Sequence, residues 1–173
     1  LAEIAAQTLL PLRVEHVETE RGETSAYAAR EHNGSLIVRS LPESSDGKEA
    51  ERQQKATYPF APIRGVLSTI LYLQQSDLRA NREIVLLVQP KERLYQVAFK
   101  YAGREQREVL GTRWQTTRLE VSIAKITDDF ALAPYDQLRK ATLWLSNTAD
   151  QVPVELHADL LVGFISVRLA SIE

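Results

Sequence analysis

The C-terminal part of the chain alternates between apolar and polar residues with a period of two. From residue 152 to residue 160, apolar side chains occupy every second position: Val152, Val154, Leu156, Ala158 and Leu160. The alternation returns after Gly163, and residues 141–146 form a further strand-like run before the polar segment 147–151. A period of two is typical of strands with one buried and one solvated face. The sequence therefore predicts an antiparallel meander at this end of the chain.

Further strands are predicted upstream of the meander. The strand-like runs are residues 12–19, 24–32, 35–41, 83–89, 94–101, 105–110 and 112–126. Asn33-Gly34 predicts a hairpin turn between two of these runs, because a type I′ turn needs a positive φ at both central positions. Ala102-Gly103 likewise predicts a turn, between residues 94–101 and 105–110.

One helix is predicted, around residues 62–75. Its apolar residues recur with the spacing of a single helical face: Ile63, Val66, Leu67, Ile70 and Leu71. Pro62 suits the first helical turn, where an N–H group would have no partner. We expect this stripe to cover the sheet, with Leu67 and Ile70 facing the meander and Ser68 facing solvent. The meander residues expected opposite the stripe are Val154, Leu156, Val167 and Leu169. A covering helix is favoured over a helix that binds a partner.

Composition narrows the function classes. The 173 residues fit a single domain, 1–173, in which residues 42–57 have almost nothing to bury and form a mobile internal loop. The 21 basic and 23 acidic residues are interspersed, so no one-signed field favours nucleic acid or an anionic membrane. Cysteine is absent, which excludes disulfides and thiolate metal sites. No apolar run is long enough for a transmembrane segment.

Four stretches carry a family resemblance. They are residues 10–15, residues 58–73, Val109-Leu110-Gly111 with the Thr-rich strand after it, and Leu143-Trp144-Leu145-Ser146-Asn147 with Val152-Pro153-Val154 and Gly163. Together they resemble the bacterial exported domain-of-unknown-function family 3108, whose usual Trp-Leu-Ser-Asp-Asp differs here at Asn147-Thr148. The likeness covers most of this chain but only the later part of the usual domain, so the chain resembles a fragment that lacks the family's early strands.

The resemblance implies a fold and a location. The fold is mainly β, with a curved antiparallel sheet like a barrel or half-barrel around the covering helix. The location is the cell envelope, as an exported protein that is periplasmic or associated with the outer envelope. The first residue is Leu1, so we expect any export signal to lie upstream of it. The family's biochemical role is not established, so the resemblance implies no reaction.

Two groups of side chains are candidates for a site. An aromatic and apolar group is a candidate surface for a lipid-like ligand: Tyr95, Val97, Phe99, Tyr101, Trp114 and Trp144. The simpler interpretation is that these residues fill one core. Glu155, His157 and Asp159 share one strand face and are weaker candidates for a metal or proton-transfer site. For them a solvated face is favoured, because one flat strand cannot wrap its ligands around an ion.

No motif points to catalysis. The chain has no Gly-x-Ser-x-Gly elbow, Gly-rich phosphate loop or His-Glu-x-x-His, and Asp128-Asp129 lacks the spaced ligands of a calcium loop. We therefore predict a non-enzymatic binding module, without a cofactor, for an apolar ligand or an envelope partner. A structural or assembly module that pairs strands with another chain is the alternative. An enzyme with a dispersed site is the third possibility, and the oligomeric state is left open.

Overall fold

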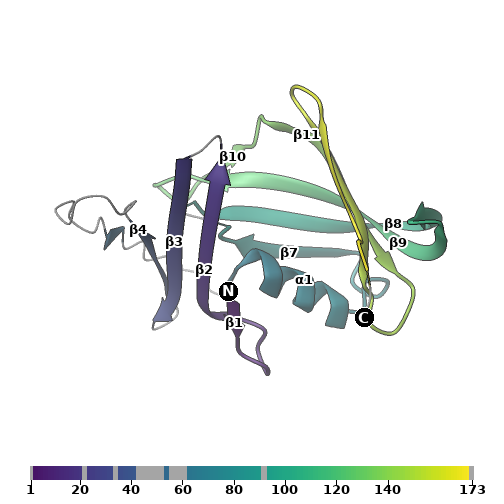
Figure 1. The fold of residues 1–173 in the computed structure, drawn as a ribbon, viewed down its shortest axis with the longest axis horizontal. Coiled ribbons are helices and arrows are strands. Elements are labelled where there is room, and N and C mark those ends of the chain that lie inside the picture. Colours follow the sequence, from purple (N-terminus) through teal and green to yellow (C-terminus); the bar gives the residue numbers. More distant parts are fainter. Residues whose placement is uncertain are drawn as a thin grey trace. The chain divides into compact units, whose positions relative to one another are not determined.

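The computed structural model describes residues 2–20, 23–32, 35–41, 53–54, 62–90 and 93–171. Within this part of the chain, strands predominate and there is one helix, α1 (Val66–Gln75) (Figure 1). The mainly β fold class predicted from the sequence is therefore confirmed. The chain divides into two compact units, one comprising Leu1–Thr69 with Leu87–Leu94 and the other Ile70–Leu86 with Tyr95–Glu173. The single domain 1–173 stays a prediction.

The first unit contains a five-stranded antiparallel sheet. Its strands, in spatial order, are β1 (Ala2–Ile4), β2 (Pro11–Glu20), β3 (Glu23–His32), β4 (Ser35–Leu41) and β5 (Gln53–Gln54). The strand predicted at residues 12–19 is confirmed as β2. The pairing of β3 with β4 begins at His32 and Ser35, while the predicted turn at Asn33-Gly34 lies outside the described residues. The predicted loop 42–57 also lies outside them, apart from β5.

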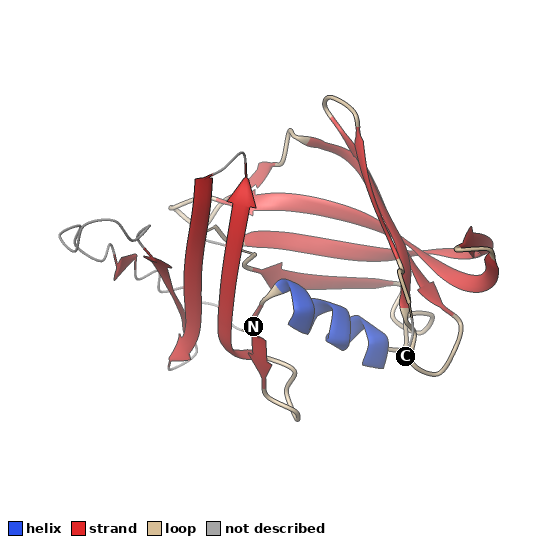
Figure 2. Cartoon of the chain, in the orientation of Figure 1, coloured by secondary structure: helices blue, strands red, loops and turns tan. Residues whose placement is uncertain are grey.

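The second sheet has eight strands. They are β6 (Ile63–Arg64), β7 (Glu83–Val88), β8 (Tyr95–Val109), β9 (Thr112–Ile126), β10 (Leu132–Pro134), β11 (Leu138–Ser146), β12 (Pro153–Leu160) and β13 (Phe164–Arg168) (Figure 2). Their order is β13-β12-β11-β9-β8-β7-β6, and β10 pairs with β9. The pairs from β8 to β13 are antiparallel and β6 is parallel to β7, so the sheet is mixed. The described strands form an open path, and the predicted closing meander is confirmed as β11, β12 and β13.

The hairpin of β8 and β9 corrects one prediction. Ala102-Gly103 is not a turn, because β8 continues through it and the register with β9 shifts at this point. Gly103 has φ 115°, which a glycine adopts readily in a β-bulge. The actual turn is two residues long and lies at Leu110-Gly111, with φ 53° and 73°. Both values are positive, as a type I′ hairpin requires.

The helix is confirmed from Val66 to Gln75, but the predicted first turn at Pro62 is wrong, because Ile63 and Arg64 form strand β6. The predicted buried stripe is also wrong. Leu67, predicted at the centre of the buried face, is 57% exposed, whereas Ser68 is 1% exposed. The buried side also carries Thr69 and Leu73. The Ser68 and Thr69 hydroxyls donate to the carbonyl oxygen of Gly65, at 3.1 and 2.9 Å. Because these hydroxyls already have a local acceptor, the polar side of the first turn can be buried at little cost.

The core of the second unit lies on one face of its strands. Its fully or nearly buried members come from four neighbouring strands: Val97, Phe99, Leu119, Leu143, Leu145 and Val154. Leu119 lies opposite Tyr101 on one side and Leu143 on the other, so the register brings these apolar positions onto one face. The opposite face of the same strands is therefore available to polar side chains, and we call it the polar face.

Candidate functional site

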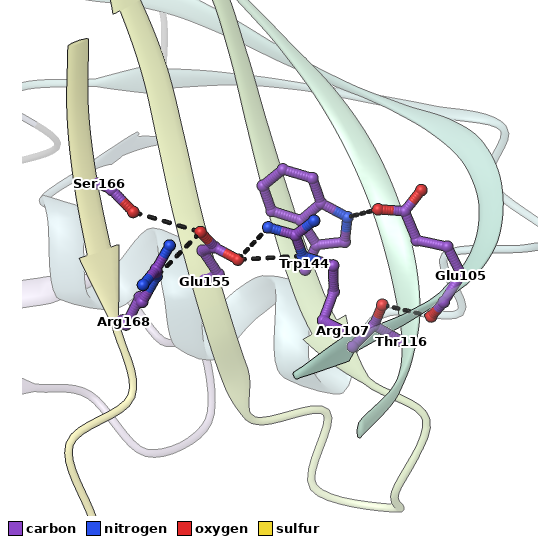
Figure 3. Close-up of polar contacts among 7 residues, drawn as sticks. All are labelled: Glu105, Arg107, Thr116, Trp144, Glu155, Ser166 and Arg168. Atoms are coloured by element: carbon purple, nitrogen blue, oxygen red, sulfur yellow. Dashed lines mark hydrogen bonds and ion pairs between the residues drawn. The ribbon is translucent and has the colours of Figure 1, made fainter. Parts of the chain in front are cut away.

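A buried carboxylate, that of Glu155 on β12, is the centre of the polar face (Figure 3). Glu155 is 3% exposed. It accepts hydrogen bonds from Nε and Nη2 of Arg107, from Nε of Arg168 at 3.2 Å and from the Ser166 hydroxyl at 3.2 Å. A buried carboxylate needs such partners, because its desolvation is otherwise very costly. We use the name carboxylate network for Glu105, Arg107, Thr116, Trp144, Glu155, Ser166 and Arg168.

Strand register explains most of this network. Glu155 lies directly opposite Trp144 of β11 and Arg168 of β13, and such cross-strand partners share a face. Arg107 comes from β8, which β9 and β11 separate from β12. In a flat sheet, three strand spacings of about 4.8 Å would hold these strands apart. The far end of the β8–β9 hairpin therefore bends over this face, beyond the bulge at Gly103.

Trp144 lies beneath Arg107. The guanidinium carbon of Arg107 is 4.3 Å from the centroid of the indole ring, in a cation–π arrangement. The indole N–H donates to the Glu105 carboxylate, and the Glu105 carbonyl accepts from the Thr116 hydroxyl at 2.7 Å. Trp144 is 7% exposed. Its side chain is thus held inside the network by a charge on one face and an acceptor at its polar edge.

The network keeps Glu155 ionised. Burial by itself raises the pKa of Glu155, but the hydrogen bonds and positive charges of Arg107 and Arg168 outweigh burial and lower the pKa below its usual range. A general base works best with a pKa near the operating pH and a free lone pair for the incoming proton. Glu155 has neither property. The arrangement is that of an electrostatic clamp between strands.

The three weaker polar candidates do not converge on one point. Glu155, His157 and Asp159 share a face, as the alternation predicts, but Glu155 is occupied by arginines. His157 Nε2 lies 3.0 Å from Asp159 Oδ1, and the imidazole stacks on Phe164 with 5.3 Å between ring centroids. Across the described ranges, no three His, Asp or Glu side chains are gathered so that they could hold a metal ion.

The apolar candidates lie on two different faces. Val97 and Phe99 are buried, while Tyr95 and Tyr101 are half-buried. Tyr101 lies opposite Leu119 on the core face, whereas Trp114 lies opposite Arg107 and Trp144 lies opposite Arg118 on the polar face. The Trp114 indole nitrogen is shielded from solvent and has no hydrogen-bond partner among the described residues. The structure therefore does not bring the six residues together on a single surface.

The exposure of the outer strand β13 is a feature that the sequence did not reveal. Among the described strands β13 ends the order of the sheet, and all five of its residues are exposed. Val167, expected opposite the helix, is 57% exposed, so that expectation is wrong. Alternation shows which residues share a face, but not whether anything covers that face. We use the name apolar edge for Leu161, Val162, Phe164, Ile165 and Val167, which are all exposed.

A polar hollow of about 260 Å³ lies between the end of α1 and the turn from β11 to β12. Ser146 and Asn147 line it. The Thr117 hydroxyl donates to Asn147 Oδ1 at 2.7 Å, and the side-chain amide of Gln151 donates to the carbonyl of Gln74 at 2.6 Å. Gln151 thus caps one of the helix carbonyls left without an intrahelical partner. These residues join the helix to the sheet.

No family model, no curated protein and no solved structure matches this chain.

Proposed function

We propose that this chain is a non-enzymatic module that binds a protein partner by adding a strand to the outer edge of β13, which no described strand occupies. The observation that carries the proposal is the exposure of β13 on both faces, at the end of the sheet. Natural proteins usually protect such edges, and exposed apolar patches mark interaction sites. The saturation of Glu155 by arginine donors supports a role without catalysis.

The backbone of β13 offers a template for pairing. The Leu169 amide donates to the Val154 carbonyl and the Leu160 amide donates to the Gly163 carbonyl, both at 3.0 Å. Odd-numbered residues of this segment therefore direct their backbone groups toward β12. Because the direction alternates along a strand, the N–H and C=O groups of Phe164, Ser166 and Arg168 point outward. An added strand would satisfy them, as in other cases of β-augmentation.

Side-chain burial adds to this pairing but does not replace it. Full burial of one Val, Ile or Phe side chain contributes about 1.5–3 kcal/mol. Phe164, Ile165 and Val167 are 68%, 52% and 57% exposed, so covering them contributes several kcal/mol together. Association costs at least about 4 kcal/mol in lost freedom. The partner therefore needs an extended strand with apolar side chains, rather than an apolar surface alone.

The family resemblance extends the proposal to location and shape. We propose, as that resemblance implies, an exported protein of the cell envelope with a sheet shaped like a half-barrel. The contact between Arg107 and Glu155 across two intervening strands supports a strongly bent sheet. No helix formed by the described residues is both long and apolar enough to span a membrane.

Capture from an extract of the source organism tests the function. The immobilised chain is compared with an Ile165→Lys, Val167→Lys double variant, and retained proteins are identified by mass spectrometry. A Gln115→Lys, Ser122→Lys variant adds the same charge at exposed positions of β9 and is the matched control. We expect proteins retained by the unaltered chain and the control, and lost from the edge variant. Identical retention by all three would overturn the proposal.

An apolar ligand is a second candidate, and Trp114 is the observation that favours it. A shielded indole N–H without an acceptor is costly, and a ligand with a polar head would supply that acceptor once the side chains that cover the indole nitrogen move aside. Native mass spectrometry of protein purified from the source organism tests this candidate. A bound small molecule that is lost in a Trp114→Phe variant supports it, and an unliganded mass argues against it.

A further inference from the structure

We infer that the partner of β13 is a second copy of the same chain, in an antiparallel pair whose two-fold axis passes beside Ser166. This inference rests on the proposed strand-pairing function and adds the identity of the partner. A two-fold axis makes each strand its own complement, so every pairing in one direction recurs in the other. The residues of β13 can therefore be tested for self-complementarity.

The backbone of β13 fits this register. When Ser166 lies opposite Ser166 of the second copy, Phe164 lies opposite Arg168 of that copy, and Arg168 lies opposite its Phe164. These are the residues whose N–H and C=O groups point away from β12. Each opposed pair can exchange two backbone hydrogen bonds, as in an antiparallel ladder. All outward backbone groups of Phe164–Arg168 then find partners within the same five residues of the other copy.

The side chains of β13 fit the same register. Ile165 lies opposite Val167 of the second copy, at a non-hydrogen-bonded position where side chains approach closely. Both are more than half exposed in the single chain, so the pair covers apolar surface on both copies. Arg168 lies opposite Phe164 of the second copy. Its Nε stays bonded to Glu155, but the side chain is 62% exposed, so the outer part of the guanidinium is open to that ring in a favourable cation–π contact.

Charge also favours this register. Arg168 is the one charged residue of β13. In this register it lies four residues, or about 13 Å along the strand, from Arg168 of the second copy. Moving the axis to Ile165 would instead place Arg168 opposite Val162. The Ser166 register is thus the one that matches apolar with apolar and cation with aromatic ring.

Disulfide cross-linking tests the register directly, because the chain contains no cysteine. Ile165→Cys and Val167→Cys chains are purified separately, mixed and treated with oxidised glutathione. We expect a cross-linked dimer in the mixture, since these positions face each other across the pair. Either variant alone should give little cross-linking, because its own copies lie diagonally, beyond the reach of a disulfide. Ser122→Cys, exposed on β9, measures random collision.

A charge swap at the axis tests the two-fold relation independently. We expect the unaltered chain to sediment as a dimer at micromolar concentration. Ser166→Lys and Ser166→Glu should each weaken dimerisation at least tenfold, because like charges meet at the axis, and mixing the two should restore it. Circular dichroism checks that both variants fold. The cysteine experiment keeps the test valid if either does not.

The outcomes separate this inference from the proposed function. A chain that remains monomeric at every concentration overturns the second copy as partner, and so does cross-linking no greater than that of Ser122→Cys. If the extract experiment then retains a different protein through the edge, the proposed strand-pairing function stands. If neither self-association nor capture depends on Ile165 and Val167, both proposals fail.

Discussion

Replacing Glu155 with glutamine removes the charge at the centre of the carboxylate network with little change in shape. Glu155 accepts two hydrogen bonds from Arg107, one from Arg168 and one from Ser166. Hydrogen bonds to a charged group contribute about 1.5–3 kcal/mol each. The side chains of Arg107 and Arg168 are 32% and 62% exposed, so water compensates part of their loss. We therefore expect Glu155→Gln to lower the free energy of unfolding by about 2–4 kcal/mol at neutral pH.

Urea unfolding followed by tryptophan fluorescence measures this loss, because Trp144 lies in the network. Glu108→Gln is the matched control. The Glu108 side chain is 64% exposed and lies 3.7 Å from Arg113, so its replacement should cost under about 0.5 kcal/mol. A similar small loss for Glu155→Gln would show that the network contributes little to stability.

The pH dependence gives a second measurement of the same carboxylate. The pKa of Glu155 is lower in the folded chain than in the unfolded chain, where glutamate titrates near 4.3. Its contribution is therefore fully present above about pH 4.3 and is lost as the pH falls through the folded pKa. The difference in unfolding free energy between the unaltered chain and Glu155→Gln should shrink in that acidic window. A difference that is independent of pH would refute the reasoning.

Three further predictions follow from packing and backbone geometry. Leu73→Ala should cost about 2–5 kcal/mol in urea unfolding because Leu73 is fully buried, whereas Leu67→Ala should cost under about 0.5 kcal/mol; equal losses would contradict the observed helix face. Leu110→Gly should raise the unfolding free energy by about 1 kcal/mol, because Leu110 has φ 53°, and a lower melting temperature would contradict it. Arg107→Ala should shift tryptophan emission to longer wavelength, because it uncovers Trp144; unchanged emission would argue against that contact.

The strand pattern could be predicted because alternation is a local property. The meander of β11, β12 and β13 follows from a period of two that is visible in the residues themselves. The face of the helix could not be predicted in the same way. Ser68 looks like a solvent-facing residue until its hydroxyl is seen to donate to the Gly65 carbonyl. Apolar spacing locates a helical stripe, but tertiary contacts decide which side is buried.

The candidate site was predictable only in part. That Glu155, His157 and Asp159 share a face follows from alternation, but the burial of Glu155 does not. Its main partner, Arg107, is 48 residues away in the chain and reaches it only because the β8–β9 hairpin bends. The exposure of Val167 was likewise hidden, since it depends on the absence of a neighbour beyond β13 among the described strands.

The carboxylate network and the apolar edge are physically linked through β13. Both faces of β13 are exposed, so side-chain burial contributes little to holding this strand in place. Its attachments are the backbone ladder to β12 and the bonds from Ser166 and Arg168 to Glu155. Arg107 continues the connection to the β8–β9 hairpin. A charged clamp suits such an edge, because polar anchoring fixes one face of the strand while leaving its apolar side chains and outward backbone groups available to a partner.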